Sequence, residues 1–158
     1  MSSLAAQLVA EFTARGLTCA TAESCTGGLI AAAITSIPGA SAVFTHGFVT
    51  YANHAKTQML GVPPKMLAAH GAVSAPVARA MAEGARACAG VDYAISTTGI
   101  AGPEGGTEEK PVGTVWFGLA GPRASTIYHQ VFQGNRETIR AQAVAFALAR
   151  LEQRGEHE

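Results

Sequence analysis

The sequence is short of charge and of aromatic side chains. Charged residues make up 14% of its 158 residues and aromatic residues 6%, and 11 basic residues balance 11 acidic ones. A protein that binds nucleic acid non-specifically normally carries a basic excess, so this balance disfavours that class and we expect no nucleic-acid partner. Hydrophobic residues, at 48%, are too many for a disordered chain. The length predicts a single domain with a normal core, over residues 1–158.

Long apolar runs are absent as well. The longest apolar stretches are broken by Gly, Thr or a charged residue well before the roughly 18 residues that a membrane span needs. Residues 1–15 contain Glu11 and lack a basic leader before an apolar run, so they do not resemble a signal peptide. We therefore expect a cytoplasmic protein with no membrane partner.

Cysteine and histidine form no metal-binding pattern. The cysteines Cys19, Cys25 and Cys88 are odd in number and match no C-x-x-C spacing, which argues against a disulfide scaffold or a zinc finger. The five histidines show no ligand spacing such as H-x-x-x-H. We expect neither a metal nor a cofactor.

Hydrophobic spacing and turn residues predict alternating helices and strands. Ser2 or Ser3 can cap a first helix that ends at Gly16. The other predicted helices cover residues 26–36, 53–61, a short piece from 63, 74–90 and 136–153, and the strands cover 17–22, 42–51, 93–98, 112–119 and 126–132. The last two strands form a hairpin, which places one strand antiparallel. This pattern predicts an α/β fold with three layers and a mixed sheet.

Three polar or glycine-rich loops follow strands, at residues 23–28, 51–56 and 97–106. Ligands of open α/β sheets bind where such loops converge, at the carboxyl ends of the strands. In the first loop Ser24 sits at the turn, as a nucleophile does, before glycines that let a ligand approach the backbone. Two alternatives stay open: Ser24 or Thr26 is only a helix cap, or Cys25 is the nucleophile rather than a buried, inert thiol.

The second loop holds a lysine at an unfavourable position. If Asn53 caps the helix, Lys56 is its third residue, and a cation there opposes the helix dipole. The same field lowers the pKa of the amine, as a general base requires. Tyr51, at the strand end, offers a phenol to the same place. The alternative is a solvated lysine and a half-buried core tyrosine.

The third loop contains neither G-x-G-x-x-G nor G-x-x-x-x-G-K-[ST]. It is typical of a backbone cradle for a phosphate or a carboxamide, with the hydroxyls of Thr97 and Thr98 at its base. The alternative is a flexible surface loop. Arg136 and Arg140, one turn apart on the last helix, can grip a phosphate together or simply lie at the surface.

Five motifs give the chain a specific resemblance. They are TAESCTGG at 21–28, GFVTY at 47–51 followed by Lys56, HGAVS at 70–74, TGIAGP at 98–103 and KPVGTV at 110–115. With them the chain resembles the CinA C-terminal domain family from about residue 4 to residue 152. Within that family it is most similar to the single-domain nicotinamide-nucleotide amidohydrolases.

The resemblance implies a three-layer α/β/α sandwich with a mixed, mostly parallel five-stranded sheet. It also implies hydrolysis of the carboxamide of nicotinamide mononucleotide, which gives nicotinate mononucleotide and ammonia for NAD synthesis. The alternatives are a non-catalytic nucleotide-sensing or partner-binding module, or an amidase that acts on another amide. We also expect a homo-oligomer, since enzymes of this size are often symmetric.

Residue roles follow from the loops and the resemblance together. Ser24 is the expected nucleophile, Lys56 the base, and Tyr51 an assistant in the proton transfer, in a reaction without metal or cofactor. The exchange of roles between Lys56 and Tyr51 stays open. The residues expected to bind the substrate, its oxyanion or its phosphate are Thr26, Gly27, Ser41, Thr98, Gly99, Ala101 and Arg140.

Overall fold

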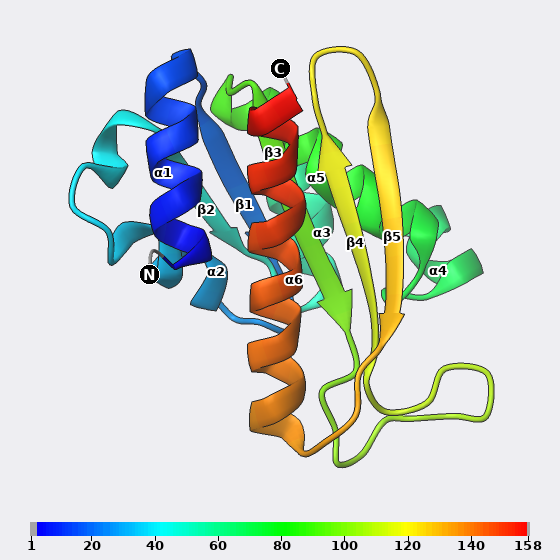
Figure 1. Cartoon of the computed structure of the whole chain (residues 1–158). Coiled ribbons are helices and arrows are strands. Elements are labelled where there is room, and N and C mark those ends of the chain that lie inside the picture. The colour runs from blue at the N-terminus through cyan, green and yellow to red at the C-terminus, as the bar shows by residue number, and fades with distance from the viewer. Residues whose placement is uncertain (1–2, 158) are drawn as a thin grey trace.

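The computed structural model describes residues 3–157 and has five strands in one mixed sheet, in the order β2-β1-β3-β4-β5 (Figure 1). The strands are β1 (Cys19–Glu23), β2 (Phe44–Val49), β3 (Tyr93–Gly99), β4 (Thr114–Ala120) and β5 (Ser125–Val131). Strands β1, β2 and β3 are parallel, and β4 pairs antiparallel with both β3 and β5. Four of the five described strands therefore run in one direction, and the predicted mixed α/β sheet is confirmed.

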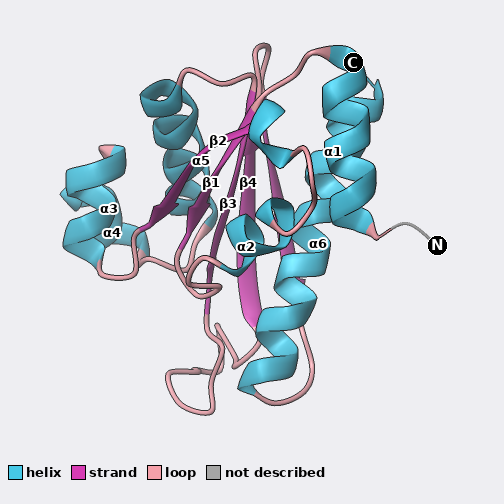
Figure 2. Cartoon of the chain, turned by 90° about the vertical axis from the view of Figure 1, so that its left-hand side faces the viewer, coloured by secondary structure: helices cyan, strands magenta, loops and turns pink. Residues whose placement is uncertain are grey.

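Helices cover both faces of the sheet (Figure 2). They are α1 (Leu4–Arg15), α2 (Leu29–Thr35), α3 (Asn53–Leu60), α4 (Pro64–His70), α5 (Ala75–Ala89) and α6 (Arg136–His157), with a 3-10 turn η1 (Ala40–Ala42) before β2. Helices α1, α2 and α6 lie on one face, and α3, α4 and α5 lie on the other. The predicted three-layer architecture is confirmed. No helix in the described range is both long enough and apolar enough to cross a bilayer.

Two hydrophobic cores, one on each face, hold the layers together. Leu8 and Phe12 of α1 pack with Ile139 of α6 in the first core. Val77 and Met81 of α5 belong to the second. Strand β1 is buried at every position because it is covered on both faces, as expected for a central parallel strand.

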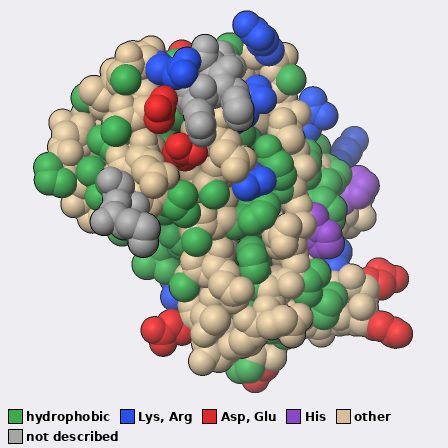
Figure 3. All heavy atoms as spheres, in the orientation of Figure 1, with side chains coloured by type: hydrophobic (Ala, Val, Ile, Leu, Met, Phe, Trp, Pro, Cys, Tyr) green, Lys and Arg blue, Asp and Glu red, His purple; other side chains and the backbone are tan. Residues whose placement is uncertain are grey.

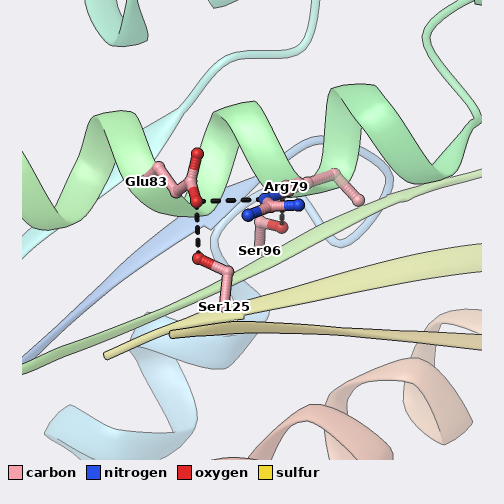
Figure 4. Close-up of polar contacts among 5 residues, drawn as sticks. Arg79, Glu83, Ser96 and Ser125 are labelled. Atoms are coloured by element: carbon pink, nitrogen blue, oxygen red, sulfur yellow. Dashed lines mark hydrogen bonds and ion pairs between the residues drawn. The ribbon is translucent and has the colours of Figure 1, made fainter. Parts of the chain in front are cut away.

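Polar side chains connect α5 to the sheet. Figure 4 shows Glu83 of α5 accepting hydrogen bonds from Arg79 Nε at 3.1 Å and from Ser125 Oγ of β5 at 2.6 Å. The buried Ser96 Oγ donates to the Ala78 carbonyl at 2.6 Å, which ties β3 to α5. On the face drawn in Figure 3, positive and negative side chains are interspersed rather than gathered into one field.

The ends of several elements differ from the prediction. Ser3 caps α1, its Oγ accepting from the Ala6 N–H at 3.1 Å, whereas Ser2 lies outside the described residues. Helix α2 begins at Leu29 instead of residue 26, because Gly27 and Gly28 take left-handed φ values of 58° and 103° and form a turn. The strand predicted over 42–51 is shorter, β2, and α6 continues to His157 instead of ending at 153.

The carboxyl ends of β1, β2 and β3 meet at one edge of the sheet, because these strands are parallel and adjacent. The turn at residues 24–28, the segment 50–52 and the loop 100–113 all leave from this edge. The three loops singled out in the sequence therefore converge, as predicted.

Candidate active site

A cavity of about 200 Å³ opens at this edge and receives residues from all three loops. Its lining consists of Ser24, Cys25, Tyr51, Asn53, Lys56, Ala72, Val73, Thr98, Gly99, Ala101 and Arg136. Of these, Asn53, Ala72 and Val73 were not expected from the sequence analysis to line the site: Asn53 was considered only as a helix cap, and Ala72 and Val73 only as part of the HGAVS motif. Arg136 had been considered there only together with Arg140.

The central contact joins a hydroxyl and an amine. Lys56 Nζ lies 3.1 Å from Ser24 Oγ, and it also donates to the carbonyls of Thr50 at 2.9 Å and Tyr51 at 3.1 Å. Lys56 is only 1% exposed. A neutral amine has two N–H donors and one lone pair. The two carbonyls can take both donors, which leaves the lone pair for the Ser24 hydroxyl proton.

Burial lowers the pKa of Lys56, since the ammonium form loses its water. The direction of the predicted shift is confirmed, but its cause is desolvation rather than the helix dipole. The predicted cap is wrong: Ala52 is the N-cap of α3, and Asn53 is its first helical residue and makes no capping bond. Lys56 is therefore the fourth residue of the helix.

The path of α3 brings Lys56 inward. Its buried residues are Lys56 and Leu60, one turn apart, so both face the protein interior. The α3 backbone comes close to α5 at Gly84, where a Cβ would collide with the Leu60 carbonyl oxygen. This close approach seats α3 against α5 while Lys56 reaches the end of β1.

Glu23 is a residue of the site whose role the sequence did not reveal. Its buried carboxylate accepts from Thr26 Oγ1 at 2.6 Å and from the backbone N–H groups of Gly28, Ile30 and Ala31 at 3.2, 2.9 and 3.0 Å. It thus satisfies the free N–H groups at the start of α2, where a negative charge is favourable. The available signal was an acidic residue at the end of an otherwise apolar strand, directly before a glycine-rich helix start.

Thr26, Gly27 and Arg140 hold the Ser24 turn and do not line the cavity. Thr26 Oγ1 is buried between Glu23 and Thr97 Oγ1, the latter at 2.8 Å. Arg140 Nε donates to the Cys25 carbonyl at 3.0 Å and Nη2 to the Thr26 carbonyl at 3.3 Å. A Cβ at Gly27 would stand 3.3 Å from Arg140 Nη2. In this geometry these residues shape the turn, and the binding role expected of them stays a prediction.

Of the other expected binding residues, Thr98, Gly99 and Ala101 line the cavity. Thr98 Oγ1 donates to the Ala72 carbonyl at 2.8 Å, which joins β3 to the segment before α5. Ser41 does not reach the cavity. It lies in η1, before the start of β2, and Phe44 of β2 pairs with Cys19 at the start of β1. Because the strands are parallel, Ser41 is at the opposite edge of the sheet from Ser24.

Tyr51 lines the cavity, and its phenol forms no hydrogen bond with Ser24 or Lys56. The side chain is 62% exposed, and its hydroxyl accepts a hydrogen bond from Arg136 Nη2 at 3.3 Å. Its backbone carbonyl, not its phenol, contacts Lys56. This geometry does not favour the expected role of Tyr51 in the proton transfer.

Cys25 lines the cavity beside Ser24, but its chemistry differs. Burial raises the pKa of the Cys25 thiol to about 11, which keeps it protonated near neutral pH. A thiol in that state is a poor nucleophile. Among the side chains that the structure describes, no group of three or more His, Cys, Asp or Glu residues is arranged to hold a metal ion.

Sequence comparisons agree over nearly the whole chain. The family model described as CinA C-terminal domain matches residues 1–154. A protein named nicotinamide-nucleotide amidohydrolase PncC, from Shigella flexneri, is 54% identical over 152 residues, which covers 96% of this chain and 92% of the relative. The protein of that name from Escherichia coli K12 has the same identity and coverage.

Solved structures share the fold as well. A CinA superfamily protein from Klebsiella pneumoniae superposes with a TM-score of 0.94 at 39% identity and covers 98% of this chain and 97% of its own. A competence/damage inducible protein from Agrobacterium tumefaciens gives 0.88 at 46% identity, covering 94% and 91%. Both similarities cover nearly the whole of this chain and of the solved chains.

Proposed function

The chain belongs to the CinA C-terminal domain family, and from this premise we propose that it hydrolyses the carboxamide of nicotinamide mononucleotide to nicotinate mononucleotide and ammonia. The relatives that bear the amidohydrolase name support the substrate. The observation that carries the chemistry is the 3.1 Å contact between Ser24 Oγ and the buried amine of Lys56. A hydroxyl beside a neutral base is the arrangement that nucleophilic amide hydrolysis requires.

In the first half of the reaction, Lys56 takes the Ser24 proton as Oγ attacks the amide carbon. The new C–O bond forms while the carbonyl electron pair moves onto oxygen, which gives a tetrahedral oxyanion. Its collapse breaks the C–N bond, and the protonated Lys56 returns the proton to the leaving nitrogen as ammonia. In the second half, Lys56 accepts a proton from water, the water attacks the acyl group, and Ser24 leaves with its hydrogen restored.

One backbone N–H group of the Ser24 turn is suited to the oxyanion. The Gly27 N–H donates to the Ser24 carbonyl at 3.0 Å and the Gly28 N–H to Glu23 at 3.2 Å, so both are engaged. Among the residues that the structure describes, the Cys25 N–H donates to no backbone carbonyl, and Cys25 lines the cavity whereas Thr26 does not. We assign the oxyanion to the Cys25 N–H. This group follows the nucleophile directly, as in other serine hydrolases with a turn of this kind.

The proposal includes a cellular setting. The product would return the pyridine ring to NAD synthesis, in the cytoplasm. A homo-oligomer stays our prediction, which sedimentation or light scattering of the purified protein can test.

Ammonia release from nicotinamide mononucleotide by the purified protein tests the proposal, with nicotinate mononucleotide identified as the second product. We expect turnover by the wild type and its loss in Ser24→Ala. Binding of the nucleotide without ammonia release would instead favour the sensing module. Full activity of Ser24→Ala would replace the acyl intermediate by direct attack of water.

A further inference from the structure

The catalytic cavity is too small for the whole proposed substrate. Cavities that bury an entire small ligand have volumes of about 300–1,000 Å³. The cavity at Ser24 measures about 200 Å³. It can take the nicotinamide ring with its carboxamide against Ser24, so the ribose and the phosphate must extend through the mouth. The residues that bind the phosphate therefore lie at the rim of the cavity.

Among the residues that the structure describes, two cationic side chains line this cavity, Lys56 and Arg136. Lys56 is buried, and its three hydrogen-bonding positions face Ser24 and two backbone carbonyls. Arg136 is exposed and carries a permanent charge. Among the side chains that the structure describes, no carboxylate forms an ion pair with Arg136.

Neutral oxygen atoms hold the Arg136 guanidinium in place. Nη1 donates to the Gly102 carbonyl at 2.8 Å, and Nη2 donates to the Tyr51 hydroxyl at 3.3 Å. These bonds attach the start of α6 to the loop 100–113 and to the segment after β2. A guanidinium has five N–H donors, so three remain for a ligand. The charge is therefore positioned without being compensated.

Arg140 cannot serve in the same way. It lies one turn further along α6, and its guanidinium is bonded to the carbonyls of Cys25 and Thr26 behind the nucleophile. It does not line the cavity.

We propose that Arg136 binds the 5′-phosphate of the substrate and makes the enzyme prefer a nucleotide to the corresponding nucleoside, with the Tyr51 phenol as the positioning residue that aims the guanidinium. This inference rests on the proposed function, since it takes the carboxamide to lie at Ser24. It also gives a role to the exposed Tyr51 phenol, which bonds to Arg136 and to neither Ser24 nor Lys56. A phosphomonoester suits a planar guanidinium that can bond two of its oxygens at once.

The test compares Arg136→Gln, Arg136→Lys and Tyr51→Phe with the wild type. Arg123→Gln is the matched control, because Arg123 is exposed in the β4–β5 turn at the opposite edge of the sheet. Two quantities are measured: kcat and KM for nicotinamide mononucleotide, and the ratio of the calorimetric Kd values of nicotinate riboside and nicotinate mononucleotide. The second needs no turnover, so it reads phosphate recognition even if the hydrolysis proposal fails.

For Arg136→Gln we expect KM to rise and the Kd ratio to fall by about 10- to 100-fold, with kcat changed by less than about threefold, since charge-assisted hydrogen bonds are lost from binding alone. Arg136→Lys should recover part of the loss, because it keeps the charge but not the paired donors. Tyr51→Phe should raise KM several-fold with little effect on kcat.

Three results would overturn the inference. The first is a wild type that binds nucleotide and nucleoside equally. The second is an Arg136→Gln variant that keeps the wild-type Kd ratio, and the third is a large loss of kcat in Tyr51→Phe at constant KM.

Discussion

Lys56 Nζ and Ser24 Oγ lie 3.1 Å apart although 32 residues separate them in the chain. Their contact makes them one functional unit, which predicts strongly non-additive losses. Ser24→Ala and Lys56→Met should each lower kcat by about 10³-fold or more, because either change removes the activated nucleophile. The double variant should be no more than about threefold worse than the weaker single variant.

Steady-state ammonia release gives the three kcat values, and near-ultraviolet circular dichroism shows whether each variant keeps its packing. Losses that multiply in the double variant would mean that Ser24 and Lys56 act in separate steps.

The lowered pKa of Lys56 predicts how activity depends on pH. The base must be neutral, so kcat/KM should rise with pH as the amine loses its proton, with a midpoint below the ordinary lysine value of about 10.4. The Cys25 thiol, with its pKa raised to about 11, stays protonated through most of this range. Profiles of the wild type and of Cys25→Ala should therefore share their midpoint. A midpoint at or above the ordinary lysine value would assign the base to another group.

The same shift has a consequence for stability with a definite sign. Between the lowered folded-state pKa and about 10.4, the unfolded chain binds more protons at Lys56 than the folded chain does. The free energy of unfolding therefore rises with pH in that window, as the cost of burying a charged amine disappears. In urea unfolding at several pH values, the wild type should gain stability relative to Lys56→Met as the pH rises. A difference that is flat or falls with pH would contradict the burial of a titrating amine.

The fold could be predicted because its determinants are local. Apolar spacing marked α1, α5 and α6, and glycines at 16 and 90 marked the helix ends that the structure has. The convergence of the three loops followed from parallel strands, whose carboxyl ends meet at one edge. The start of α2 was predicted too early, because the left-handed turn at Gly27 and Gly28 delays the helix. The ends of the strands were also predicted inexactly.

The site was harder to predict, because it depends on which way each side chain leaves its element. Arg136 and Arg140 are one turn apart, and only the rotation of α6 against the core decides that the first faces the cavity and the second the Ser24 turn. Tyr51 was placed correctly at the strand end, but its phenol turns toward α6. The sequence gives no information on the distance between Ser41 and Ser24. Within one chain, Ser41 lies before the start of β2, at the edge of the sheet opposite to Ser24.

Thiol chemistry should separate Cys25 from Cys88. Cys88 is exposed, whereas burial raises the pKa of Cys25 to about 11, so iodoacetamide should modify Cys88 first. Mass spectrometry should find a single modified cysteine in the folded protein, and the modified enzyme should keep its activity. Cys88→Ser should then resist modification under the same conditions. Rapid inactivation of Cys88→Ser by the reagent would restore Cys25 as a candidate nucleophile.

Glu23 should prove a positioning residue whose loss reaches both stability and catalysis. Glu23→Gln keeps the size of the side chain but replaces one acceptor oxygen by an NH₂ group, which faces N–H donors at the start of α2. We expect a loss of about 1–3 kcal/mol in the free energy of unfolding, since buried N–H groups are left without a partner. The matched control is Glu11→Gln, whose carboxylate forms a half-exposed i,i+4 pair with Arg15 at 3.3 Å and should cost about 0.5 kcal/mol or less. Because the Ser24 turn lies between Glu23 and α2, the Glu23→Gln substitution should displace the nucleophile. We therefore expect kcat to fall by about tenfold or more while KM changes little.

Two outcomes would contradict this role of Glu23: equal stability of the two variants in urea unfolding, or an unchanged kcat for Glu23→Gln. Either would show that the glycines and Arg140 hold α2 and the Ser24 turn without the buried carboxylate.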